Sequence, residues 1–324
     1  MTRNSFYYCL KPVIPRSLQI FLRRRIVLAR RKSLAHVWPI DHGTGHPPPG
    51  WAGWPGRKRF ALVLTHDVET AAGLRKCRDL VFMEKELGFR SSFYFVPERC
   101  DVPGGLLHYI RNQGFEVGVH GLKHDGKLYN SWEMFSERAS RINDYLREWD
   151  AVGFRSPSMH HNLEWLHELE IEYDASTFDT DPFEPQADGV RTIFPFFVHG
   201  DSRQKGYVEL PYTLPQDFTL FVLMKEKGID IWRRKLDWIA SRGGMALVNT
   251  HPDYMSFEAG QLERDEYPAD LYMEFLEYVR ANYGDSFWHV LPREMAGFWA
   301  EEVSRKKYRE GSETRSNQAF VAGS

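Results

Sequence analysis

Short apolar runs alternate with amphipathic segments along the central part of the chain. The run FALVL at residues 60–64 is continuous and predicts a buried strand. Residues 72–88 then space their apolar side chains as a helix does, and this pattern stops at Gly88. The predicted strands cover residues 59–67, 91–97, 115–120, 151–157, 171–177, 206–212, 245–252 and 286–292, and the predicted helices cover 72–88, 104–114, 131–149, 162–170, 228–243 and 268–284. Repeated strand–helix units predict an α/β fold with a parallel sheet, and at this length we expect a closed or nearly closed barrel.

Both ends of the chain differ from this central part. Residues 1–57 read as a basic segment followed by a linker rich in proline and glycine, and 58–300 read as the barrel domain. Residues 301–324 form a polar tail that we expect to be disordered.

The first 33 residues contain nine Lys and Arg side chains and no acidic one, with apolar residues between them. This segment is too charged and too short to span a membrane, and it lacks the long apolar run of a signal peptide. A basic amphipathic helix at this place could lie on an anionic membrane surface. Alternatively, it packs on the domain with its arginines in water, and both interpretations stay open.

Composition narrows the class of partner and the compartment. The 42 Lys and Arg residues nearly balance the 44 Asp and Glu residues, so the chain as a whole does not resemble a nucleic-acid-binding protein. Cys9, Cys77 and Cys100 show no paired spacing, which predicts a reducing compartment without a disulfide framework. We therefore expect the cytoplasm, or the cytoplasmic face of the membrane.

Five of the predicted strands end at a residue that can ionise or bind a metal. These residues are Asp67 with Glu69, His120 with His124 four positions later, Arg155, Asp174 and His251. Because active sites of such barrels lie at the carboxyl ends of the strands, we expect these side chains at one face.

The residue types at these strand ends favour a metal site. Side chains alternate along a strand, so Asp67 and Glu69 should point to the same side and His66 to the other. Two neighbouring carboxylates repel each other, and a cation between them relieves this repulsion. His120 and His124 offer neutral nitrogens, and two imidazoles with one carboxylate form an open zinc site. His66 is interpreted as a structural residue bonded to its neighbours.

The segments THDVE, HGLKH, RSPS, YDAST and LVNTHPD, in this order, resemble the five motifs of the polysaccharide deacetylases. This family is also called the NodB-homology group or carbohydrate esterase family four. The resemblance covers about residues 58–298 and departs from the family at Gly121, which replaces the usual Ser or Thr. It implies a distorted, TIM-like (β/α)7 barrel with a divalent metal, often zinc. It also implies hydrolysis of an N-acetyl or O-acetyl group on a glycan by a metal-activated water.

The first motif carries the main departure from the family. Two adjacent aspartates are usual there, one the general base and one a metal ligand, and Asp67 matches the base. Val68 stands at the second position and cannot bind metal, but some relatives use an acid one residue further on, which is Glu69 here. Alternatively, Asp67 itself binds the metal, or no metal is bound.

The remaining motifs supply the other roles that the resemblance implies. His120 and His124 match the histidine ligands of the metal, and Arg155 matches the arginine that holds the base. Asp174 matches the acid that pairs with the last histidine, and His251 matches that histidine, the general acid.

Three functions remain open at this point. The first is a metal-dependent deacetylase acting on a glycan, or on a lipid-linked glycan precursor, with peripheral membrane contact through the basic N-terminus. The second is a metal-independent or cyclic-amide hydrolase on the same scaffold, which the missing second aspartate favours. The third is a non-catalytic glycan-binding protein.

Overall fold

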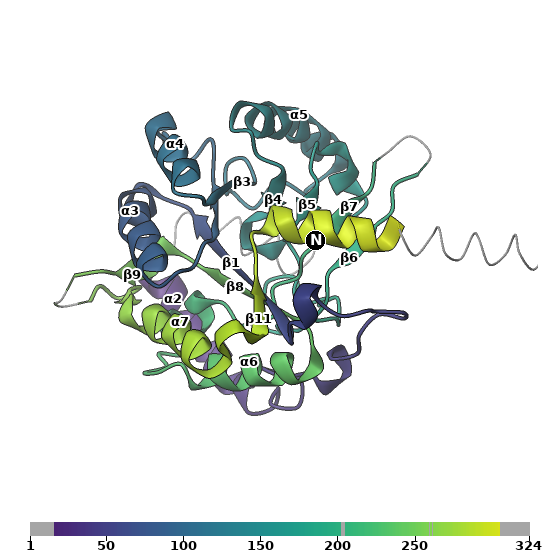
Figure 1. Ribbon diagram of the computed structural model, residues 1–324. Coiled ribbons are helices and arrows are strands. Elements are labelled where there is room, and N and C mark those ends of the chain that lie inside the picture. The colour runs from purple at the N-terminus through teal and green to yellow at the C-terminus, as the bar shows by residue number, and fades with distance from the viewer. Residues whose placement is uncertain (1–15, 202–204, 259, 261, 305–324) are drawn as a thin grey trace, which may run out of the picture.

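A single curled sheet forms the centre of the molecule (Figure 1). The computed structural model describes residues 16–201, 205–258, 260 and 262–304. The strands are β1 (Phe60–Val68), β2 (Ser92–Phe95), β3 (Glu116–His120), β4 (Gly153–Arg155), β5 (Tyr173–Asp174), β6 (Phe196–Val198), β7 (Tyr207–Glu209), β8 (Met245–Thr250) and β11 (Phe287–His289). Their order is β11-β1-β2-β3-β4-β5-β7-β6, and β8 pairs with β1. All of these pairs are parallel except β6–β7.

Irregular backbone, not a strand ladder, brings the two ends of this sheet together. The amides of Thr213 and Leu214, which follow β7, both donate to the carbonyl of Leu247 in β8 at 3.1 Å. The sheet therefore curls into a barrel that is distorted where this segment replaces a strand. The predicted fold class, a distorted (β/α)7 TIM-like barrel, is confirmed.

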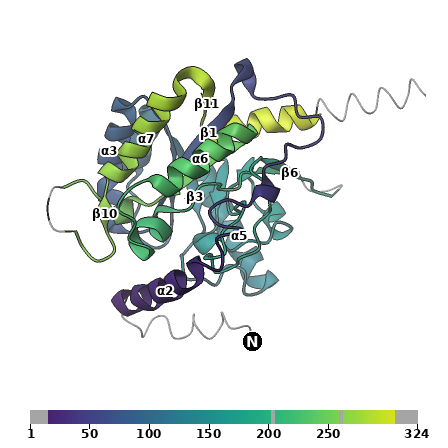
Figure 2. The same cartoon turned by 90° about the horizontal axis from the view of Figure 1, so that it is seen from below.

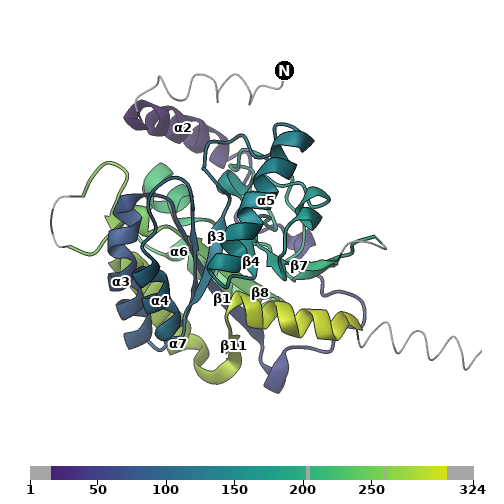
Figure 3. The same cartoon turned by 90° about the horizontal axis from the view of Figure 1, so that it is seen from above.

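Helices cover the outside of the sheet in each of the three views (Figures 1 to 3). They are α3 (Ala71–Glu86), α4 (Gly104–Asn112), α5 (Trp132–Glu148), α6 (Asp230–Arg242), α7 (Asp270–Tyr283) and a last helix at residues 292–304. Short turns of 3-10 helix occur at η1 (His42–Thr44), η2 (Pro55–Arg57), η3 (Pro157–Met159), η4 (Trp165–Glu168), η6 (Pro252–Tyr254) and η7 (Gly284–Ser286), a π-helical segment forms η5 (Phe218–Leu223), and β9 (Met255–Ser256) pairs with β10 (Tyr267–Pro268). Helix α2 (Arg16–Arg31) lies apart from the helices that cover the sheet and packs on the segment η5.

Burial on both faces explains the sequence of β1. All nine residues of this strand are buried, because one face looks into the barrel and the other lies under helices. The strand therefore reads as a continuous apolar run and not as an alternating one. Its polar residues come only at the carboxyl end, where they reach the end of the barrel at which the parallel strands finish.

Most predicted elements agree with the structure to within a few residues, and Ser131 caps α5 as its position suggests. The predicted helix at 162–170 is wrong, because only Trp165–Glu168 forms a turn of 3-10 helix. Leu169 is already extended there, and Glu172 donates to the carbonyl of Val152 as the chain enters β5. Strand pairing therefore overrides the local helical preference.

The segment predicted as a linker packs on the barrel wall. Trp54 is buried, its indole nitrogen donates to the carbonyl of Gly243 at 2.7 Å, and its ring lies near Trp51, Phe194 and Trp299. The last helix passes the expected boundary at residue 300 and continues to 304. Residues 1–15 and most of the predicted tail lie outside the described residues.

None of the helices within the described ranges combines the length and the apolar character that crossing a bilayer requires.

Gly153 in β4 permits a close contact that a larger residue would prevent. A Cβ at this position would come within 2.1 Å of the Tyr173 hydroxyl oxygen. This hydroxyl accepts from Tyr94 at 2.8 Å and donates to Glu116 at 2.7 Å, so it has no freedom to move away.

We therefore expect Gly153→Ala to destabilise the fold by about 1–3 kcal/mol, the usual cost of overpacking. Gly104→Ala is the matched control, because a Cβ there meets nothing within 4 Å, and its unfolding free energy should change by less than about 0.5 kcal/mol. Urea denaturation of the three proteins measures both values, and equal midpoints would contradict the prediction.

Candidate active site

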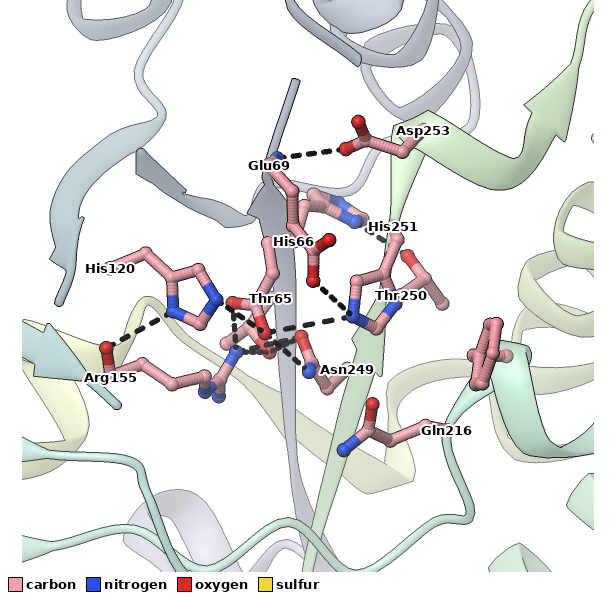
Figure 4. A network of polar contacts seen from close by, with 12 residues as sticks. Thr65, His66, Glu69, His120, Arg155, Gln216, Asn249, Thr250, His251 and Asp253 are labelled. Carbon is pink, nitrogen blue, oxygen red and sulfur yellow. Dashed lines mark hydrogen bonds and ion pairs between the residues drawn. The ribbon is translucent and has the colours of Figure 1, made fainter. Parts of the chain in front are cut away.

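The carboxyl ends of β1, β3, β4 and β8 converge on one point, where Glu69, His120, Arg155 and His251 lie around the end of β1 (Figure 4). The Nε2 atom of His251 lies 3.8 Å from Asp67 Oδ2 and 4.0 Å from Glu69 Oε1. The two acids therefore share one side of the strand, as alternation predicts. Six of the seven predicted site residues surround this point, and Asp174 is the exception.

Asp67 is a buried carboxylate held from two sides. Its Oδ1 accepts from Arg155 at 3.1 Å, and its Oδ2 accepts from the side-chain amide of Asn249 at 2.8 Å. Burial by itself would raise the pKa of Asp67, but the charges of His120, Arg155 and His251 hold it below its ordinary value. Asp67 is therefore an ionised, oriented carboxylate, which suits a general base.

Arg155 fixes this carboxylate from a fully buried position. Its Nε donates to the carbonyl of Ala175, and its NH1 donates to Thr65, Asp67 and Asn249. The guanidinium carbon lies 4.6 Å from the centroid of the Tyr94 ring. Such a buried cation cannot change rotamer without losing all of these partners.

Glu69, His120 and His124 form the one group of three metal-binding side chains found within the described residues. One ligand atom from each lies within 4.8 Å of the others. The three side chains come from two segments: Glu69 directly follows β1, His120 ends β3, and His124 lies in the turn after β3.

The two histidines suit a metal ion in their protonation and hydrogen bonding. His120 Nδ1 donates to the carbonyl of Arg155 at 3.1 Å, which turns Nε2 towards the site, and burial lowers the pKa of His120 to about 4. His124 Nε2 is buried and makes no hydrogen bond of good geometry, although Glu69 Oε1 lies 3.0 Å away. A neutral imidazole and an unsatisfied ligand atom beside a carboxylate fit a divalent cation.

A left-handed turn, not a helix, brings the two histidines together. Gly121 has a φ of 60°, and a Cβ there would meet the Pro157 ring at 2.5 Å. This close approach and the positive φ explain why glycine stands at this position. The rings of His120 and His124 lie 5.3 Å apart between their centroids.

His251 pairs with Asp217, a residue that the sequence did not indicate. The ring Nδ1 lies 2.7 Å from Asp217 Oδ1, and the backbone amide of His251 donates to Oδ2 at 2.8 Å. Burial opposes the charged form, but the carboxylate of Asp217, with Asp67 and Glu69 beyond it, raises the pKa of His251 to about 10. The imidazole therefore carries its proton at neutral pH and can donate it.

The predicted pairing of Asp174 with His251 is wrong. Asp174 accepts from the hydroxyl of Ser176 at 2.6 Å and from its amide at 3.0 Å, and Ser176 in turn accepts from the amide of Ser156 at 2.8 Å. Asp174 thus supports the loop directly after Arg155. Strand β5 lies between β4 and β7, whereas His251 follows β8 and has Asp217 at its Nδ1 atom.

His66 lies on the opposite side of β1, as interpreted from the sequence. Its ring nitrogens lie 2.7 Å from the Thr250 hydroxyl and 2.9 Å from Glu84 Oε1 of α3. Both neighbours are buried, so His66 joins the strand to its covering helix and does not reach the site.

Two functional side chains were missed for different reasons. Asn249 lies two residues before His251 in β8, so strand alternation could have placed it beside Asp67. Asp217 directly precedes the π-helical segment η5. The sequence pattern predicts no strand or helix at this segment, so strand alternation could not have placed Asp217 at the site.

No protein-family model matches the sequence, and neither does any curated protein. A Mycobacterium smegmatis protein assigned as a polysaccharide deacetylase superposes with a TM-score of 0.60 at 19% identity, covering 79% of this chain and 96% of that chain. The allantoinase PuuE gives a TM-score of 0.59 at 16% identity, covering 76% and 92%. A Pseudomonas aeruginosa PAO1 protein, also assigned as a polysaccharide deacetylase, gives 0.57 at 16% identity, covering 77% and 93%.

The chain has the polysaccharide deacetylase fold. In this deacetylase fold, the group of Glu69, His120 and His124 could hold a divalent metal. The unusual pattern Asp-Val-Glu keeps two acids at the site although valine occupies the position between them.

The geometry predicts that Glu69, not Asp67, is the acidic metal ligand. Glu69→Ala and His124→Ala should each weaken binding of Zn²⁺ by more than about a hundredfold, because losing a ligand costs more than losing the residue that supports one. Asp67→Asn should bind Zn²⁺ within about tenfold of the wild type, since its oxygens are engaged by Arg155 and Asn249. Titration against a chromophoric chelator measures the affinities, and circular dichroism verifies folding. The reverse order of affinities would exclude this assignment.

A second prediction concerns Asp217, the carboxylate that stabilises the protonated form of His251. In the metal-free protein, Asp217→Asn should lower the pKa of His251 by roughly one unit or more, because the imidazolium loses its nearest negative charge. Asp174→Asn is the control and should leave this pKa unchanged. NMR titration of the histidine ring protons measures the pKa, and a shift in the Asp174 variant alone would restore the original pairing.

Proposed function

We propose that this protein is a hydrolase that removes an N-acetyl or O-acetyl group from a glycan with the help of a divalent metal. One observation carries the proposal. An ionised carboxylate, Asp67, and a protonated imidazole, His251, lie 3.8 Å apart beside the group of Glu69, His120 and His124. A base and an acid placed so close to each other can serve the two proton transfers that amide hydrolysis requires.

The metal would be held by Glu69, His120 and His124, and zinc suits this set because two imidazoles and one carboxylate leave a position open. When bound, the ion supplies Lewis-acid polarisation of the acyl oxygen and lowers the pKa of a water from ~15.7 towards ~7. Glu69 suits this role because it is ionised. Burial raises the pKa of Glu69, but the imidazoles of His124, His251 and His120 lower it further, to well below its ordinary value.

Asp67 would take the proton from the attacking water. Arg155 keeps the carboxylate ionised, and Asn249 fixes its other oxygen, so the accepting lone pair has one direction. After attack, the leaving amine needs a proton, because an amide anion is a very poor leaving group. His251 would supply this proton while Asp217 stabilises its charged form.

Asp174 would act as a positioning residue through Ser176 and the loop after Arg155, and not as a catalytic acid. We further propose that the substrate is an acetylated glycan or a lipid-linked glycan precursor, met in the cytoplasm at the membrane face. The balanced charge of the chain supports a neutral or mildly charged substrate over nucleic acid.

Cyclic-amide hydrolysis is the second candidate. It is favoured by the similarity to the allantoinase structure, whose TM-score of 0.59 nearly equals the value of 0.60 for the first deacetylase structure. The same base and acid would serve ring opening, because that reaction also breaks an amide bond.

The deciding experiment offers the zinc-loaded protein two substrates, N-acetylglucosamine oligosaccharides and allantoin. We expect acetate release from the oligosaccharides, and we expect Asp67→Asn and His251→Ala to lower its rate by about 10²–10⁴-fold, the usual contribution of a positioned base or acid. His36→Ala is the control, because His36 is exposed and makes none of the contacts described for the site, and this variant should retain the full rate.

Consumption of allantoin without acetate release would favour the second candidate. Zinc binding with neither reaction would favour a glycan-binding role.

A further inference from the structure

Helix α2 lies across one end of the barrel, apart from the helices that surround the sheet (Figures 2 and 3). Ile20 and Val27 are its buried contacts with the domain. Arginines of the helix also contact the domain. Arg24 NH2 donates to the carbonyl of Val222 at 2.9 Å, and Arg31 NH1 lies 2.5 Å from Glu226 Oε1. Part of the basic charge of this helix therefore holds it against the barrel.

The outer face of α2 is apolar, which inverts the usual arrangement of a surface helix. Its large exposed side chains are Leu18, Phe21, Leu22, Ile26 and Leu28, each between 43% and 58% exposed. Only three other large apolar side chains among the described residues are comparably exposed, and they are Phe82, Trp132 and Leu262. Within the described ranges, large exposed apolar side chains are thus concentrated on one helix.

Positive charge borders this apolar face. Arg25 and Arg30 are exposed, the Arg25 guanidinium lies 5.9 Å from the centroid of the Phe21 ring, and the helix contains no acidic residue. A second copy docking through the same face would bring like charges together. An anionic lipid surface instead accepts both the apolar side chains and the arginines.

We propose that α2 docks this protein on an anionic membrane surface, with the side chains of Leu18, Phe21, Leu22, Ile26 and Leu28 entering the boundary between headgroups and acyl chains. The helix lies in the plane of the surface and does not cross it. Both observations are needed for this assignment, since the exposed apolar side chains supply insertion and the arginines supply the preference for anionic lipid.

This docking places the catalytic face of the barrel near the membrane. Helix α2 packs on η5, the segment that directly follows Asp217, the partner of His251. Arg23 of the same helix donates to the carbonyl of Phe183 at 3.4 Å. A substrate with a lipid anchor would reach the site from this side, a consequence that rests on the proposed function, whereas the docking itself does not.

The test uses the full chain and sedimentation with vesicles, without substrate. The wild type should bind vesicles of equal parts phosphatidylcholine and phosphatidylglycerol, and it should bind phosphatidylcholine vesicles much more weakly. The double variant Phe21→Ser/Ile26→Ser should bind the vesicles roughly tenfold or more weakly, because it lacks two apolar side chains that docking would bury in the membrane. Arg25→Gln should lose about fivefold and show a weaker salt dependence, as expected for one charge near the surface.

Phe82→Ser is the matched control, because Phe82 is 65% exposed on α3 and lies outside the docking face. It should bind the acidic vesicles as the wild type does, and thermal unfolding by circular dichroism should show that all variants are folded. Failure of the wild type to bind acidic vesicles would overturn the proposal, and so would undiminished binding by the double variant.

Gel filtration without lipid tests the alternative that a second copy of this chain covers the apolar face of α2. A wild-type dimer that the double variant converts into monomer would assign the face to a second copy and overturn membrane docking. Because no step of this test measures turnover, an inactive protein that binds the vesicles would contradict only the proposed function.

Discussion

The buried ion pair between Arg155 and Asp67 is the interaction on which the site depends. A guanidinium with no exposure is costly to bury, and here the cost is offset by donation to a carbonyl, a hydroxyl, an amide oxygen and a carboxylate. Removing one partner of such a pair usually costs about 3–5 kcal/mol, because the remaining charge stays buried. The same bonds that stabilise the barrel interior thereby orient the carboxylate that we propose as the base, so the stability of the fold and the geometry of the candidate site depend on the same contacts.

Three histidines of the site region illustrate how partner chemistry decides function. The Nδ1 atom of His120 lies beside a backbone carbonyl, and burial lowers the pKa of this histidine to about 4. His251 has the carboxylate of Asp217 at the same atom, and its pKa rises to about 10. The protonation of the first suits a role as metal ligand, and that of the second suits the role of proton donor that we propose. His66, one residue before Asp67, is turned away to Glu84 and takes no part.

The position of α2 relates the site to the surface of the molecule. Arginines usually face water, yet Arg23, Arg24 and Arg31 here contact the barrel while leucine, isoleucine and phenylalanine face outwards. A sequence pattern of alternating basic and apolar residues is compatible with either orientation. Only the packing of Ile20 and Val27 against the domain shows which face remains available to a partner.

The sequence by itself determined the strand–helix order, the barrel class and six residues of the site, because parallel strands deliver their last residues to one face and alternation decides the side on which they point. It also placed Asp67 and Glu69 together and His66 apart. The tertiary structure alone decided the partner of His251, since Asp217 is remote in sequence and follows no predicted strand, whereas Asp174 lay in a matching motif but too far around the barrel. It also decided the closure of the sheet by irregular backbone and the outward apolar face of α2, because both depend on which surfaces meet and not on any local period.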